Sequence, residues 1–93
     1  MTLGKAIFVI SPEVMAEKLE TGLAITKLGT ERVVILNATG CSIWNLLDGQ
    51  KTLDLLISSL ATQFELTPAA ISQDVNDFID RLLAAGLIVE KYQ

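Results

Sequence analysis

Few side chains in this sequence could carry out chemistry. The chain contains no histidine, which excludes Ser-His and Cys-His catalysis and histidine-based metal sites. Cys41 is the single thiol, and we expect it to be a small buried apolar residue rather than a nucleophile. Asp77 and Asp80 lie three residues apart on a solvated helix face, and nothing nearby completes an oxygen cage. We therefore expect no catalytic residue, no metal site and no cofactor, and we expect that the protein is not an enzyme.

The composition favours one small globular binding domain. The chain has 93 residues, of which 51% are apolar, and this is enough for one core. We expect a single domain over residues 1–93, with its core at about residues 14–89. The 11 acidic residues outnumber the 7 basic ones and give a formal charge of −4, so we expect no nucleic-acid partner.

No segment is typical of secretion or membrane insertion. The apolar run over residues 6–10 ends at Ser11-Pro12, whereas a signal peptide needs an apolar region of ~7–15 residues. No run approaches the ~20 apolar residues of a membrane span, so we expect no membrane partner. A lone thiol suits a reducing compartment. The sequence therefore predicts a cytoplasmic protein.

Short strands are predicted in the first part of the chain, over residues 14–19, 23–28 and 32–36. The two connections are each about three residues long, so these strands should form an antiparallel meander. Residues 33–36 are apolar at four consecutive positions, and we expect both faces of this strand to be covered. Residues 7–10 could add a further strand, which Pro12 restricts to an edge.

From residue 37 onward, apolar residues recur with the period of an α-helix. Asn37 or Thr39 caps the first helix, Asp48-Gly49 ends it, Thr52 caps the second, Thr67-Pro68 opens the third and Gly86 ends the third. Gly40 should allow the first helix to approach the sheet closely, and Trp44 should pack in the core. Three strands followed by three helices indicate an α+β fold of winged helix-turn-helix-like type.

The third predicted helix carries a wide apolar arc. Its members are Ile71, Val75, Phe78, Ile79, Leu82 and Leu83. The whole arc could pack against the other helices, or one edge could stay open as part of a groove. Asp74 and Arg81 flank the arc on the Phe78 side. The excess of acidic residues on this helix disfavours the DNA-reading role that a helix-turn-helix protein would give it.

The second half of the chain contains an ordered set of short motifs. It reads LNATGCSIWNLLDGQKT, then LATQFEL, then DVNDFIDRLLAAGLI. This order resembles the PqqD family, whose members are also called precursor-peptide recognition elements of ribosomal peptide (RiPP) pathways. The matching positions are Leu36-Asn37, Thr39-Gly40, Ile43 to Leu47, Asp48-Gly49, Thr52, Asp74-Val75 and Gly86-Leu87. The resemblance covers about residues 23–89.

The resemblance implies a three-stranded sheet, three helices and no catalysis. It implies an adaptor that binds the leader of a precursor peptide and presents it to a modifying enzyme or leader protease, in lasso-peptide or PQQ-like biosynthesis. The leader would add as a strand to the edge of the third strand and lie against the third helix. The predicted leader-binding residues are Arg32, Val33, Val34, Ile35, Asp74, Val75, Phe78, Arg81 and Leu82.

Each predicted site residue has a role. The backbone of residues 32–35 would pair with the peptide. Val34 and Leu36 should face the core, leaving Val33 and Ile35 on the ligand side. Phe78 and Leu82 would line an apolar slot, and Arg81 could pair with an acidic leader residue. Asp74 could instead stabilise its helix, because a carboxylate near the start of a helix interacts favourably with the helix macrodipole.

Two other functions stay open from the sequence. One is a winged-helix regulator that binds DNA. The other is a non-catalytic subunit that stabilises a larger enzyme and does not bind free leader. An unoccupied strand edge could also pair with a second copy and form a homodimer.

Overall fold

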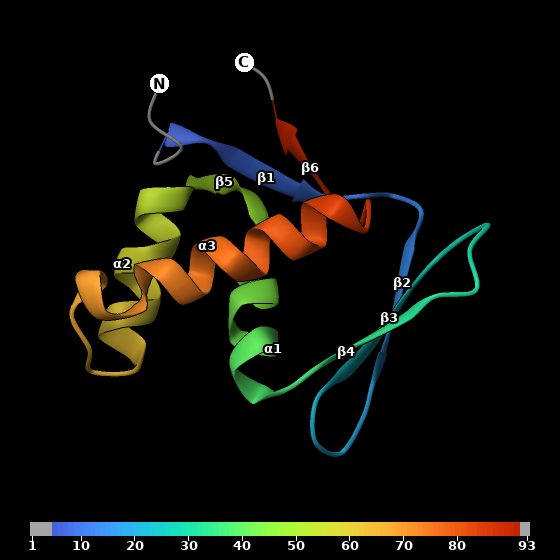
Figure 1. Ribbon diagram of the computed structural model, residues 1–93, viewed down its shortest axis with the longest axis horizontal. Coiled ribbons are helices and arrows are strands. Elements are labelled where there is room, and N and C mark those ends of the chain that lie inside the picture. The colour runs from blue at the N-terminus through green and yellow to red at the C-terminus, as the bar shows by residue number, and fades with distance from the viewer. Residues whose placement is uncertain (1–4, 92–93) are drawn as a thin grey trace.

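The strands among residues 5–91 form two three-stranded antiparallel sheets (Figure 1). The computed structural model describes residues 5–91. One sheet has the order β2-β3-β4, with strands Val14–Lys18, Leu23–Lys27 and Val33–Leu36. The other has the order β5-β1-β6, with strands Asp48–Thr52, Ile7–Ile10 and Ile88–Lys91. The α+β architecture with an antiparallel meander before the helices is confirmed.

The second sheet differs from what the sequence predicts. The prediction that residues 7–10 form an edge strand is wrong, because β1 pairs with β5 on one side and β6 on the other. Pro12 lies beyond the end of β1 and so removes no ladder hydrogen bond. β5 was not predicted, since its sequence DGQKT has Thr52 as its one β-branched residue and contains no aromatic residue.

Within residues 5–91, three helices follow the meander. They are α1 (Ala38–Asn45), α2 (Leu53–Gln63) and α3 (Pro68–Ala84). Asn37 rather than Thr39 caps α1, and its Oδ1 accepts a hydrogen bond from the Gly40 N–H at 2.8 Å. The predicted caps Thr52 and Thr67 are confirmed. The predicted end of α3 at Gly86 is confirmed as well, with φ of +72° just beyond the Ala85 cap.

The prediction that Asp48-Gly49 ends α1 is wrong. The helix ends at Asn45 with Leu46 as its cap, and the next residues enter β5. Gly49 does have a positive φ of +76°, but it packs against β1. A Cβ there would lie 2.9 Å from Val9 Cγ1, so the glycine allows β5 to approach β1 closely.

We expect the Thr67→Ala substitution to lower the free energy of unfolding by about 1 kcal/mol. The Ala70 N–H donates to the Thr67 Oγ1 at 3.3 Å and to the Thr67 carbonyl at 3.0 Å, and alanine removes the side-chain acceptor of this pair. Chemical denaturation measures the loss. Thr67→Ser keeps the hydroxyl and should stay close to the parent, and an equal loss in both variants would contradict the capping role.

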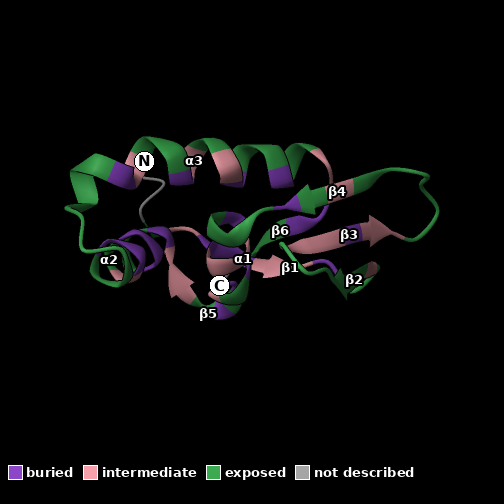
Figure 2. Ribbon diagram, turned by 90° about the horizontal axis from the view of Figure 1, so that it is seen from below, coloured by how far each residue is buried: buried purple, intermediate pink, exposed green. Residues whose placement is uncertain are grey.

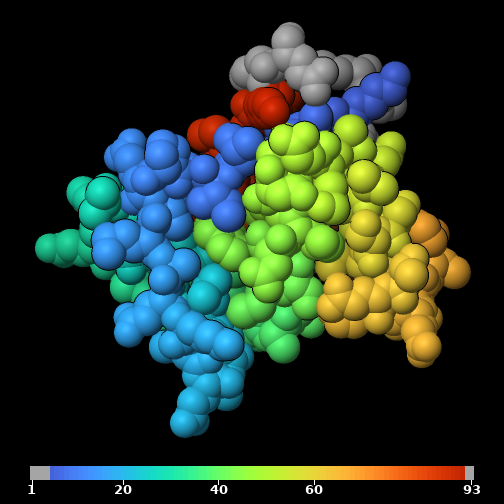
Figure 3. All heavy atoms as spheres, turned by 180° about the vertical axis from the view of Figure 1, so that it is seen from behind, coloured from blue at the N-terminus to red at the C-terminus, as the bar shows by residue number. Residues whose placement is uncertain are grey.

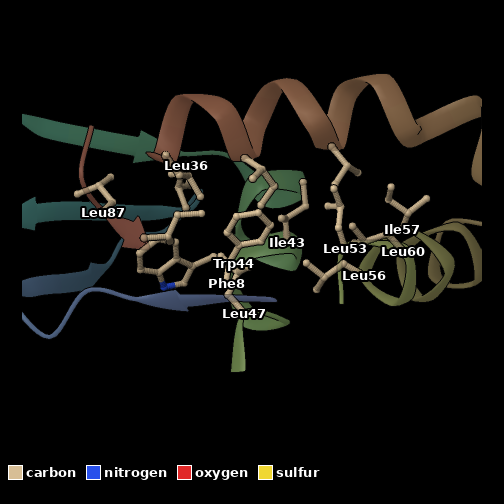
Figure 4. Close-up of a cluster of buried hydrophobic side chains, with 14 of the residues drawn as sticks. Phe8, Leu36, Ile43, Trp44, Leu47, Leu53, Leu56, Ile57, Leu60 and Leu87 are labelled. Atoms are coloured by element: carbon tan, nitrogen blue, oxygen red, sulfur yellow. The ribbon is translucent and has the colours of Figure 1, made fainter. Parts of the chain in front are cut away.

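One cluster of buried side chains joins the helices and both sheets. α3 lies as one layer over α1, α2 and the sheets (Figure 2). Phe8 from β1, Leu36 from β4 and Trp44 from α1 meet beneath it (Figure 4). Trp44 is buried, which confirms its predicted place in the core. Cys41 is half-buried beside this cluster.

The face opposite α3 is formed by other elements. In Figure 3 the β2–β3 hairpin, α1 and α2 lie side by side across it, and only the start of α3 reaches its rim. Among residues 5–91, no helix combines the length and apolar character needed to cross a membrane.

Candidate functional site

A groove of about 920 Å³ runs between β4, the start of α1 and the part of α3 from Asp74 onward. Its lining residues include Arg32, Val34, Ile35, Leu36, Asn37, Thr39, Gly40, Asp74, Asp77, Phe78, Arg81, Leu82 and Ala85. Apolar side chains from β4 and α3 line it together with charged ones from α3 and with Arg32, which directly precedes β4. This volume and mixed lining are typical of a site that binds a ligand with apolar and polar parts.

The hydrogen bonds around the first hairpin fix the direction of the β3 backbone groups. The Leu19 N–H donates to the Gly22 carbonyl, and the Leu28 N–H donates to the Glu13 carbonyl, both at 2.9 Å. The backbone groups of residues 22 and 28 therefore point toward β2. Because this direction alternates along a strand, those of Leu23 and Ile25 point toward β4.

The register then shows which β4 groups are free. Leu36 lies opposite Leu23 and Val34 lies opposite Ile25, so their N–H and C=O groups pair with β3. The N–H and C=O groups of Val33 and Ile35 point the other way, to the unpaired edge of the sheet. β4 thus offers two residues with both backbone groups available to an added strand.

The side chains of β4 alternate across the sheet. Leu36 is buried and Val34 is half-buried, which confirms the predicted core-facing pair. Val33 and Ile35 lie on the outer face and are 57% and 60% exposed. The chain itself leaves this outer face open, so the expected cover of the second face stays a prediction about a ligand. Ile35 still borders the groove, whereas Val33 does not.

One face of α3 forms the other wall. Asp74, Asp77, Phe78 and Arg81 follow helical spacing along it. The half-buried Phe78 ring lies close to α1, where a Cβ at Gly40 would stand 3.3 Å from Phe78 Cε1. The same Cβ would stand 3.2 Å from the Leu36 Cβ. Gly40 therefore lets α1 approach both β4 and α3, which extends its predicted role.

Most of the predicted site residues line this groove: Arg32, Val34, Ile35, Asp74, Phe78, Arg81 and Leu82. Val33 is absent from the lining, and Val75 is buried in the core. The sequence analysis did not propose Asn37, Thr39, Gly40 or Asp77 for the groove. Asp77 could have been found, since it shares a helix face with Asp74 and Arg81.

The groove charges have no ion-pair partner among residues 5–91. The single salt bridge there joins Lys51 to Asp48, outside the groove, and the Lys51 hydrogen bond lowers the pKa of the Asp48 carboxyl. Asp77 Oδ1 accepts a hydrogen bond from Gln73 Nε2 at 2.9 Å. Asp74 lies beyond the first turn of α3, so the alternative role at the macrodipole is not supported. Within the described residues, no group of Cys, Asp and Glu is placed to hold a metal ion.

Comparison with known families gives a match over most of the chain. The model for coenzyme PQQ synthesis protein D (PqqD) matches residues 11–88. The chain belongs to the PqqD family. The stretch matched by this PqqD-family model includes both walls of the groove and leaves out β1.

A solved structure shares the fold of this PqqD-family chain. It is described as TbiB1 in complex with the TbiA(beta) leader peptide, and the TM-score is 0.78 at 22% sequence identity. The similarity covers 91% of this chain and 98% of that chain. Comparison with curated protein sequences gives no match.

Proposed function

We propose that this chain is a non-catalytic adaptor for a ribosomally made precursor peptide. It captures the leader segment by β-strand addition and presents the precursor to a modifying enzyme or leader protease, in lasso-peptide or PQQ-like biosynthesis in the cytoplasm. The observation that carries the proposal is the unpaired edge of β4, which opens onto a groove walled by α3. Membership of the PqqD family and the fold shared with a protein whose structure is described as a complex with a leader peptide support it.

The mechanism uses backbone pairing for affinity and side chains for selectivity. An extended peptide beside β4 satisfies the N–H and C=O groups of Val33 and Ile35. Alternate peptide side chains then point to opposite faces of the enlarged sheet. One set enters the groove between Val34 and Phe78, and the other set lies on the outer face.

The chain contributes binding and positioning rather than chemistry. A leader held on β4 leaves the remainder of the precursor free to enter a partner enzyme. The acidic residues on α3 disfavour a nucleic acid as the ligand of this surface. An empty β4 edge could also pair with a second copy, and leader would compete with such a dimer.

Titration with a synthetic leader tests the proposal. The peptide is taken from a short precursor gene next to the gene for this chain, and backbone amide shifts are followed by NMR. We expect saturable binding at micromolar Kd or tighter, about −8 kcal/mol. The largest shifts should fall on the amides of Val33 and Ile35 and on the α3 face around Phe78.

The contrary result is also clear. A folded protein that shows no saturable shift with this leader, yet copurifies with an enzyme of the same gene cluster, would favour the stabilising subunit. Shifts confined to residues outside β4 and α3 would remove the strand-addition mechanism while keeping peptide binding.

A further inference from the structure

α3 and β4 run in opposite directions along the groove. The C-terminal end of α3 lies near the start of β4, because a Cβ at Gly86 would stand 2.7 Å from the Nζ of Lys27, next to the β3–β4 turn. The middle of α3 lies near the end of β4, because Phe78 and Leu36 both approach Gly40. Figure 2 shows the same antiparallel course. Residue numbers therefore increase in opposite directions along the two walls of the groove.

This arrangement separates the groove charges by sign. Arg32, just before β4, and Arg81 on the last turns of α3 lie at one end, with Lys27 near the end of α3. Asp74 and Asp77 lie at the other end, where β4 runs into α1. The N-terminus of α1 adds about half a positive charge there, which offsets only part of the two carboxylates.

These charges are available to a ligand. Asp77 and Arg81 are four residues apart on α3, a spacing that commonly forms ion pairs, yet they form none here. Arg32, Asp74, Asp77 and Arg81 are all exposed, and none forms a salt bridge with another residue of the described chain. A groove with one basic and one acidic end can distinguish peptides by the order of their charges, which backbone pairing alone does not do.

We propose that the groove selects an extended peptide by the order of its charges. The occupant has a basic residue before its apolar middle and an acidic residue after it. The order follows from antiparallel pairing, which continues the pattern of the sheet and is the more stable arrangement. The peptide's N-terminal end then lies against Asp74 and Asp77, and its C-terminal end against Arg32 and Arg81. This inference rests on the proposed function and names its class of peptide.

Three synthetic peptides of equal length test the inference. All share an alternating Leu-Thr centre: the first has two lysines before it and two glutamates after it, the second has these ends exchanged, and the third has glutamines at both ends. We expect the first to bind about three- to tenfold more tightly than the second at low salt, because exposed ion pairs each contribute modestly. The difference should nearly vanish in 1 M salt.

A charge-exchanged protein provides the matched control. The double variant Asp77→Arg with Arg81→Asp keeps the net charge and alters two exposed positions. We expect it to weaken or reverse the preference between the first two peptides, while circular dichroism shows an unchanged fold. A parent that binds both orders equally, or a variant that keeps the parent's preference, overturns the inference.

The inference and the proposed function fail in different ways. If the natural leader binds at β4 and the charge order of the synthetic peptides has no effect, only the charge selection is wrong. If the leader shows no binding, the proposed function is wrong whatever the synthetic peptides do. Absence of binding by all three synthetic peptides also overturns the charge selection.

Discussion

Replacing Ile35 by proline is expected to weaken leader binding by roughly ten- to a hundredfold while leaving the protein folded. Proline lacks the N–H that Ile35 presents at the free edge of β4, and its ring occupies the path of an added strand. A missing partner for a buried peptide carbonyl costs about 1–3 kcal/mol, and each 1.4 kcal/mol is a factor of ten. An edge strand tolerates proline where the N–H faces outward. Isothermal titration with the leader measures the loss.

Two substitutions on the same strand separate the backbone from the side chain. Ile35→Ala keeps the N–H and removes an exposed side chain, so it should bind far better than Ile35→Pro. Val34→Pro removes an N–H that pairs with β3 and should destabilise the fold itself. Equal binding by Ile35→Pro and the parent would mean that the leader does not pair with β4. A Val34→Pro variant as stable as the parent would mean that the direction of the backbone groups is assigned wrongly.

Gly22→Ala is expected to lower the free energy of unfolding by about 3 kcal/mol, near the upper end of the usual cost of overpacking. A Cβ at Gly22 would overlap the carbonyl oxygen of Leu36, a backbone atom that cannot rotate away. The substitution therefore pushes β3 and β4 apart where β4 enters α1. Urea denaturation measures the stability, and leader binding should fall with it because β4 is one wall of the groove.

Gly29→Ala in the next hairpin is the matched control. Apart from Gly29 itself and its two chain neighbours, no atom of residues 5–91 lies within 4 Å of the position of its Cβ, so only the positive φ of +83° opposes alanine, at about 1 kcal/mol. We expect Gly22→Ala to be clearly more destabilising than Gly29→Ala. Equal losses would indicate that β3 and β4 separate easily and that the close approach at Leu36 has little energetic weight.

The sequence correctly predicted the turns and helix starts that depend on interactions between neighbouring residues. The hairpin turns set the meander, and the hydroxyls of Thr52 and Thr67 set two helix starts. The second sheet escaped prediction, since β1 pairs with strands that follow it by about 40 and 80 residues and one of them is polar. Gly49 illustrates why the second sheet was missed. A glycine with a positive φ can end a helix or lie in a strand, and only its close contact with Val9 of β1 shows that Gly49 lies in a strand.

Only part of the candidate site could be predicted from the sequence, because contacts between distant segments position the rest. The family resemblance and the apolar arc placed Phe78 and Arg81 at a groove, and both line it. The arc did not reveal that Val75 faces the core while Phe78, three residues later, reaches the groove. That difference arises from the position of α1, whose Gly40 leaves room for the Phe78 ring. Such contacts between distant segments carry no periodic signal.

The two walls of the groove, β4 and α3, are separated by more than 30 residues of chain. No short segment can therefore hold the groove together alone, and the groove exists only while the whole core is assembled. By mass action, any ligand of this groove then acts as a stabiliser of the native state. At a free concentration of one hundred times its Kd, it would add about 2.7 kcal/mol to the free energy of unfolding. Under the proposed function, a bound precursor would thus protect the chain from unfolding and proteolysis.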